Sequence, residues 1–533
     1  MDFLDVVYMA AVLILAVLWW LHCFSSSDTS KANLPPAHAA GPSSATSSRS
    51  SFSAARSCIS SATSAASTAP SSSSAWGSAP SSSSSSDLIH EALVRRGPLF
   101  ASRPPDSPTR IIFSSGKRTI NSAPYGPLWR SLRRNLVSQL VSPSRLPSFS
   151  WIRHWAVSLL LSRLREASGG GAAAVEIMPH LRLTICSILA CICFGVKVAE
   201  EKIKEIEEVL KEIMLMTTPK LADFLPALTP LFRSQLRAAR KLRQRQLDCL
   251  LPLVRARRAF VERGVQDSDW EMLVPAGEAY VDSLLTLDAA GPLGDEELVT
   301  LCSEVMSAGT DTSATSLEWA MLHIVLDQPA QERLHREVAA AAAAAAASGE
   351  RIADEEDVEK MPYLTAVVKE TLRRHPPSHF LLSHAATREA ELGGYRIPAE
   401  ASVEFYTAWV TEDPAIWERP KEWLPERFME GGDGSDTDVT GTKSVRMTPF
   451  GAGRRICPAA TLGMLHVHLL LANIVREFWL VAPPGNPPDP TEAFAFTVVM
   501  KHPLRAVLHQ RNYQRRVKEM GLHTYGSRML QAV

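Results

Sequence analysis

The stretch Phe450-Gly451-Ala452-Gly453-Arg454-Arg455-Ile456-Cys457-Pro458-Ala459 stands directly before an apolar run from Leu462 to Val475. The apolar run predicts a helix that starts behind Cys457, and amides at a helix start lower a thiol pKa and donate hydrogen bonds to sulfur. Gly451 and Gly453 let the backbone turn tightly against a flat ligand, and Arg455 supplies a charge for an anionic group on it. These features are what a haem iron bound by cysteine needs.

A buried free thiol beside a loop is the ordinary interpretation of a cysteine taken alone. The flanking residues here favour a ligand instead, because the stretch resembles the haem-binding signature of the cytochrome P450 superfamily. Phe450, Gly453, Arg455 and Cys457 fall on the positions of that pattern. Ala459 departs from it, since the family usually has glycine there, and we expect the extra methyl group to crowd the haem slightly.

The composition of the whole chain excludes some functions. Among 533 residues the 56 basic and 56 acidic side chains balance, which argues against a nucleic-acid partner. The eight cysteines show no paired metal-binding spacing, and their use favours a reducing compartment over a disulfide scaffold.

The N-terminal residues predict a membrane anchor over 1–24. Val6 to Phe24 is almost entirely apolar, and only acids, Asp2 and Asp5, precede it. The basic residues after it place the body in the cytosol by the positive-inside rule. Residues 25–36, which end in Leu34-Pro35-Pro36, resemble the proline hinge of microsomal P450s.

Residues 37–86 have an unusual composition, with 23 serines among 50 residues and no Asp or Glu. Such a segment cannot bury enough apolar surface to fold, so one interpretation is a disordered linker. The other is an out-of-frame translation, because a shifted frame of Pro36 to Thr46 can encode a continuation of the hinge. Sequencing the transcript distinguishes the two. The catalytic domain is expected over 87–533.

A long helix is predicted from Gly294 to about Leu326, with acids at its N-terminus. Ala308-Gly309-Thr310-Asp311-Thr312-Ser313 in its middle are poor helix formers, and we expect them to loosen the hydrogen bonds there. Neutral structure is the alternative for such a cluster. The resemblance to the central P450 helix assigns Thr312 to oxygen activation, Asp311 to proton supply and Ala308 to the substrate pocket.

Two spaced pairs add to the resemblance. Trp129 and Arg133 lie four residues apart, on one face of a helix, which could equally be a surface pair. Glu370 and Arg373 could also form an ordinary surface ion pair. In the P450 family, the first pair lies at a haem propionate, whereas the second is buried and joined by a later arginine, here Arg427, in a structural network.

The substrate pocket and a further haem contact are assigned by family position. Ser378, His379, Phe380 and Leu381 are expected to line the cavity, and His384 to meet a propionate. His379 receives no catalytic role. Near the end of the chain, Ala493 to Val499 alternates like a strand, and Phe494 and Phe496 are expected to add apolar wall.

Several further elements follow from periodicity and charge. Helices are predicted over Val175–Phe194, Glu200–Met216 and Met361–Arg374. The basic stretch Arg233–Arg263 predicts a solvated helix pair, or a face on anionic lipid. The alanine run Ala339–Ala347 predicts a helix extension or a surface loop.

The resemblance to plant microsomal P450s implies a mainly α-helical fold with small β-sheets, an N-terminal anchor and haem b. It implies a monooxygenase that inserts one oxygen atom from O2 into a lipophilic small molecule. Electrons would come from NADPH through NADPH-cytochrome P450 reductase, with the catalytic domain on the cytosolic side of the endoplasmic reticulum membrane. Relatives that rearrange hydroperoxides typically lack the alcohol found at Thr312. A catalytically inactive P450-like membrane protein stays as the alternative.

Overall fold

The computed structural model describes residues 85–218, 233–266, 270–288, 291–345 and 353–511. The predicted anchor, the hinge and nearly all of the serine-rich segment lie outside these residues. Within the described ranges, no helix combines the length and the apolar character needed to cross a lipid bilayer.

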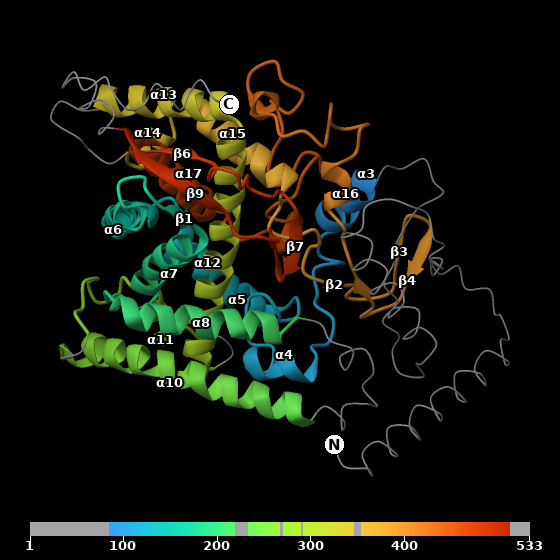
Figure 1. The fold of residues 1–533 in the computed structure, drawn as a ribbon. Helices are drawn as coiled ribbons and strands as arrows, with labels where there is room; N and C mark the ends of the chain where they lie inside the picture. The colour runs from blue at the N-terminus through green and yellow to red at the C-terminus, as the bar shows by residue number, and fades with distance from the viewer. Residues whose placement is uncertain (1–84, 219–232, 267–269, 289–290, 346–352, 512–533) are drawn as a thin grey trace, which may run out of the picture.

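The helix α12, Asp295–Leu326, forms the central column of the body (Figure 1). It starts where predicted: Glu297 Oε2 accepts the Gly294 amide at 2.8 Å, and three acids occupy the first turn. It contacts α7 (Met178–Phe194), α10 (Arg233–Arg263) and α17 (Ala460–Glu477). Burial against these neighbours stabilises α12 more than its poor helix formers weaken it.

The expected loosening around Ala308–Ser313 is wrong, because α12 is continuous there. The Thr312 hydroxyl donates to the Ala308 carbonyl at 2.7 Å, so this side chain bonds within its own helix.

The remaining helices surround α12. The N-terminal half contributes α3 (Ser85–His90), η1 (Glu91–Arg95), α4 (Pro108–Phe113), α5 (Pro127–Leu136), η2 (Val137–Val141), η3 (Leu146–Phe149), α6 (Ser150–Ser168), α8 (Glu200–Met216) and α11 (Tyr280–Leu285). The C-terminal half contributes α13 (Gln328–Ala345), α14 (Glu355–Val358), α15 (Pro362–Arg374), α16 (Ala408–Thr411), η5 (Pro425–Phe428) and η6 (Gly453–Arg455).

The strands are short and form small antiparallel sheets. One sheet has the order β1-β9-β6, with β1 at Ala174–Glu176, β9 at Arg505–Gln510 and β6 at Phe478–Val481. The two-stranded sheets pair β2 (His384–Ala385) with β5 (Ser402–Val403), β3 (Ala390–Leu392) with β4 (Tyr395–Ile397), and β7 (Glu492–Ala495) with β8 (Thr497–Met500). The predicted mainly helical fold with small sheets is confirmed.

Several predicted elements differ in detail. Arg233–Arg263 is one helix, α10, with Pro252 inside it, rather than a helix pair. Val175 belongs to β1, so the helix predicted from that residue begins at Met178. The alternating stretch 493–499 is a hairpin that turns at Phe496, whose φ is 69°. Ala495 pairs with Thr497, so Phe496 alone forms the turn between the two strands.

Candidate functional site

Cys457 lies between the 3₁₀ turn η6 and the start of α17. Its backbone amide donates to the Phe450 carbonyl at 2.7 Å, which closes the loop. Burial raises the pKa of the Cys457 thiol, while the Ala459 amide and Arg133 act in the opposite direction. The chain therefore directs one amide and one guanidinium charge at this sulfur, as a thiolate ligand requires.

Glycine is required at one position of this loop. Gly453 has a φ of 68°, and a Cβ there would lie 1.7 Å from the Leu93 carbonyl oxygen of η1. Any side chain would push η1 away from the cysteine loop. Ala459, which departs from the family pattern, has a φ of −101°, a conformation that alanine adopts without strain.

Arg455 extends from the cysteine loop toward α5 and the loop that precedes it. Its guanidinium donates to the carbonyls of Ala101, Ile120 and Ala123 at 2.6–3.0 Å. The same group lies 4.6 Å from the centre of the Trp129 ring. Trp129 is buried and donates its Nε1 hydrogen to the Ile120 carbonyl at 3.1 Å. The cation that stacks on Trp129 is thus Arg455 rather than its sequence neighbour Arg133.

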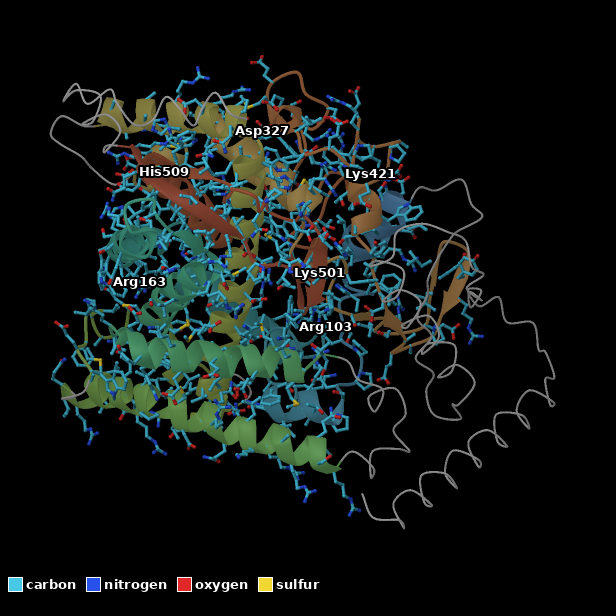
Figure 2. The ribbon with its side chains drawn as sticks, viewed as in Figure 1. Arg103, Arg163, Asp327, Lys421, Lys501 and His509 are labelled. Atoms are coloured by element: carbon cyan, nitrogen blue, oxygen red, sulfur yellow. The ribbon has the colours of Figure 1, made fainter. Side chains whose placement is uncertain are left out.

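Arg103 is a functional candidate that sequence reasoning missed. It lies in the segment between η1 and α4 (Figure 2) and donates to the carbonyls of Asn121, Leu382 and Ser383 at 2.7–2.8 Å. Its charge acts on both Arg455 and His384. No local sequence signal points to Arg103, because its partners lie far along the chain.

The three arginines Arg103, Arg133 and Arg455 form a half-buried cluster of positive charge, which we call the cation cluster. Burial, together with a neighbouring guanidinium charge, lowers the pKa of Arg103 to about 10, and burial with the charges of Arg103 and Arg133 lowers that of Arg455 to about 9. Burial also lowers the pKa of Arg133, which lies close enough to Cys457 to interact with its charge. Among the residues that the structure describes, no carboxylate lies within ion-pair distance of the three side chains. Buried cations normally require an anionic partner, so the donor set fits an anionic ligand such as a haem propionate.

His384 lies beside this cluster, on β2. Its Nδ1 lies 2.7 Å from the Phe100 carbonyl, and because a carbonyl only accepts, Nδ1 carries the proton. Burial and Arg103 lower the pKa of His384 to about 3, so the ring is neutral at physiological pH. An anion that neutralised the cation cluster would raise this pKa and favour a donating imidazolium.

One face of α12 is less buried than the rest of the helix. It carries Glu304, Ala308 and Thr312, which are spaced four residues apart; Glu304 and Thr312 are half-buried and Ala308 is exposed. Glu304 accepts the backbone amides of Ile120 and Asn121 at 3.0 and 2.7 Å. Sequence reasoning missed Glu304, although its spacing from Ala308 and Thr312 could have identified it.

Glu304 also connects to the cation cluster through a peptide group. The Ile120 carbonyl accepts from Arg455, while the Asn121 amide of the same peptide donates to Glu304. This peptide lies with its negative end toward the cation and its positive end toward the acid. Burial raises the pKa of Glu304 from 4.5 to about 7, against the two amides and the attraction of Arg455 and Arg103.

Asp311 lies next to Thr312 on α12 but is buried, with 3% of its surface exposed. Arg182 of α7 forms an ion pair with its Oδ1, and the Thr497 hydroxyl of β8 donates to its Oδ2 at 2.5 Å. Arg182 also pairs with Glu207 of α8. Asp311 thus belongs to a buried polar chain that joins three helices and a hairpin.

The predicted network of Glu370, Arg373 and Arg427 is assembled and buried. Arg373 makes two hydrogen bonds to the Glu370 carboxylate, at 2.7 and 2.9 Å, and Arg427 adds one at 3.0 Å. Arg427 also pairs with Asp433 at 2.9 Å. The same arginines donate to loop carbonyls between 411 and 422, so the network fixes the chain that leads toward the cysteine loop.

The predicted pocket residues come from two segments. The Ser378 hydroxyl donates to the Phe380 carbonyl at 2.7 Å. Leu381 packs against a hydrophobic cluster and lies near Gly451. His379 Nε2 lies 3.2 Å from Glu492 Oε2, so the loop after α15 and the β7–β8 hairpin meet at this pair. Phe494, on β7, has 39% of its surface exposed. Within 378–383, the chain forms one isolated β-bridge, between Phe380 and Tyr406.

The iron ligand would be Cys457 alone. Elsewhere in the described ranges, no group of three or more histidine, cysteine or acidic side chains could hold a metal ion, and all six described cysteines are free.

Comparisons with known proteins agree with this geometry. The family model for cytochrome P450 matches residues 81–509. Cytochrome P450 89A9 of Arabidopsis thaliana is 36% identical over 436 residues, covering 80% of this chain and 83% of that protein. Phenylacetaldehyde oxime monooxygenase CYP71AN24 of Prunus mume is 31% identical, covering 80% of this chain and 79% of that protein. A zebra fish cytochrome P450, solved with progesterone, superposes with a TM-score of 0.65 at 21% identity, covering 80% of this chain and 92% of that one, which shows the fold.

Proposed function

Because the chain belongs to the cytochrome P450 family of monooxygenases, we propose that it inserts one oxygen atom from O2 into a lipophilic small molecule, with Cys457 as the ligand of a haem b iron. The observation that carries this proposal is the cation cluster beside Cys457. Arg133 interacts with the charge of Cys457 and with Arg455, which in turn interacts with Arg103. The hydrogen bonds of Arg103 and Arg455 go to backbone carbonyls. An anionic, flat cofactor held through sulfur satisfies both features.

Each residue of the cysteine side has a separate task in this proposal. Cys457 binds the iron as a thiolate, which the Ala459 amide and Arg133 favour. Arg103, Arg133, Arg455 and His384 hold the propionates, and Trp129 orients Arg455 through its ring face. Phe450 packs next to Gly463 at the start of α17 and so supports the cysteine loop. When bound, the thiolate-ligated haem supplies O–O bond cleavage.

The residues of α12 handle protons. Asp311 takes a proton from solvent and supplies it to the Thr312 side of the helix. The Thr312 hydroxyl holds a proton at Oγ1, which in this structure is donated to the Ala308 carbonyl. The wall of the substrate pocket selects the substrate and excludes water. It is formed by Ala308, Ser378, His379, Phe380, Leu381, Phe494 and Phe496. The apolar members of this wall favour a lipophilic molecule.

We also propose the partner and the location. Electrons come from NADPH through a membrane-bound NADPH-cytochrome P450 reductase. Residues 1–24 anchor the protein in the endoplasmic reticulum membrane, with the catalytic domain in the cytosol. The apolar run Val6–Phe24 and the plant P450 relatives support this placement.

A carbon monoxide difference spectrum of the expressed full chain tests the proposal. We expect the Soret band of thiolate-ligated haem in the wild type and its loss in Cys457→Ala. Cys191→Ala is the matched control, because Cys191 is a buried free thiol on α7, and it should retain the band. A wild-type protein without this band would contradict the monooxygenase function and support the inactive alternative.

A further inference from the structure

The β7–β8 hairpin meets α12 through a buried polar contact. The Thr497 hydroxyl donates to Asp311 Oδ2 at 2.5 Å, and the two residues expose 2% and 3% of their surface. A buried hydrogen bond to a carboxylate is stronger than a neutral one. The contact therefore fixes the first residue of β8 to the middle of α12.

The other oxygen of Asp311 is held from the opposite direction. Arg182 pairs with Oδ1, and the same guanidinium pairs with Glu207 of α8. Each carboxylate oxygen of Asp311 thus has a partner, one cationic and one a neutral hydroxyl. Before Asp311 can pass a proton along α12 it must give up one partner, and the neutral hydroxyl is the weaker of the two.

Thr497 is also coupled to the apolar wall. It follows Phe496, which forms the turn of the hairpin with a φ of 69°, and it pairs across the hairpin with Ala495, next to the exposed Phe494. A molecule pressing on Phe496 acts on the residue next to Thr497, and one pressing on Phe494 acts on the residue next to Ala495, the cross-strand partner of Thr497.

We propose that Thr497 is a positioning residue for Asp311, which holds the acid in a resting position until contact at the Phe494–Phe496 turn releases it. This inference rests on the proposed role of Asp311 in proton supply. The released Oδ2 accepts a proton from solvent and donates it on the Thr312 side, so the acid returns unchanged. The contact would thereby link the filling of the pocket to proton delivery.

Thr497→Val removes the hydroxyl at nearly constant volume, and Thr497→Ser retains it. The matched control is Thr491→Val, which removes a threonine hydroxyl that donates to the exposed Asp489 at 2.6 Å. Without substrate, NADPH and reductase reduce O2 to hydrogen peroxide, with two electrons and two protons consumed per O2. We expect Thr497→Val to raise this rate at least about tenfold, since Asp311 loses a charge-assisted hydrogen bond. Thr497→Ser and Thr491→Val should match the wild type.

A second measurement does not depend on turnover. Hydrogen–deuterium exchange of peptides over 492–500 should be faster in Thr497→Val and in Asp311→Asn, and no faster still in the double variant. If the two substitutions increased the exchange rate additively, the two side chains would act independently, and the proposed coupling between them would be overturned. Asp311→Asn without any effect on NADPH oxidation would contradict the proposed role of Asp311. An effect of Asp311→Asn, with Thr497→Val at the wild-type rate, would overturn this inference alone.

Discussion

Two groups of arginines, one buried and one half-buried, differ in how their charge is neutralised. In the Glu370 network, Arg373 and Arg427 share one carboxylate, and Arg427 pairs with Asp433 as well. In the cation cluster, Arg103 and Arg455 donate only to backbone carbonyls. The first group is complete within the chain, whereas the second retains positive charge.

This difference distinguishes a scaffold from a ligand site. A buried ion pair that meets all its partners fixes backbone geometry but gains nothing from an added ion. A buried cation without an acid carries a desolvation cost, which an anionic ligand recovers on binding. The Glu370 network therefore fits a scaffold that holds the loop in place, and the cation cluster fits the proposed site for the cofactor propionates.

The largest expected effect comes from breaking the complete network. Glu370→Gln leaves Arg373 and Arg427 buried without their shared charge, and we expect a loss of roughly 3–5 kcal/mol in the free energy of unfolding. Chemical denaturation of the expressed protein measures it. Arg396→Ala is the control, because its ion pair with Glu389 is more than half exposed and screened by solvent, so its loss should leave the stability close to that of the wild type. Equal stability of Glu370→Gln and the wild type would contradict a structural role.

The opposite outcome is expected in the cation cluster. Arg133→Met removes a half-buried charge near Cys457 while keeping the apolar length of the side chain. We expect the apoprotein to be as stable as the wild type or more so, whereas haem affinity falls about ten- to a hundredfold with the loss of a charged partner. Haem transfer to a competing apoprotein measures the affinity. A destabilised apoprotein with unchanged haem affinity would reverse the distinction between the two groups.

A smaller effect is expected from the acid that faces the cluster. Folding raises the pKa of Glu304 from 4.5 to about 7, so the folded state favours the protonated form. This contribution to stability is complete below about pH 4.5 and is lost as the pH rises through about 7, with a slope of at most about 1.4 kcal/mol per pH unit. In Glu304→Gln, the free energy of unfolding of the apoprotein should no longer show this part of its pH dependence.

Glu318→Gln provides the matched control for that measurement. Burial raises the pKa of Glu318 to about 7 as well, but its carboxylate accepts the Leu504 amide, away from the cluster. Both variants should flatten the pH dependence of unfolding, and only Glu304→Gln should also strengthen haem binding, because it removes a negative charge that competes for Arg455 and Arg103. A haem effect of equal size in both variants would show that the position of Glu304 is irrelevant.

The sequence predicted those parts of the site that depend on neighbouring residues. The cysteine loop, the start of α12 and the Glu370–Arg373 spacing are local patterns, and the structure has all three. Arg103 was not predictable, because its hydrogen-bond partners at 121, 382 and 383 meet only after folding. The β7–β8 hairpin was predicted as one strand, because Phe496 gives no turn signal although its φ is positive.

Propensity misled us at one further position. The glycine and threonines of Ala308–Ser313 predicted a loosened helix, yet α12 continues through them because its buried neighbours and the Thr312–Ala308 bond stabilise it. Tertiary packing overrides a weak local preference.

The most direct test of the account compares the affinity of the apoprotein for haem and for haem dimethyl ester, whose propionates carry no charge. If the cation cluster binds the propionates, the wild type should prefer haem by about tenfold or more, and Arg133→Met should lose much of that preference. Glu370→Gln, in whatever fraction folds, should retain it. Equal affinity of the wild type for the two compounds would contradict the assignment of the cation cluster as the anion site.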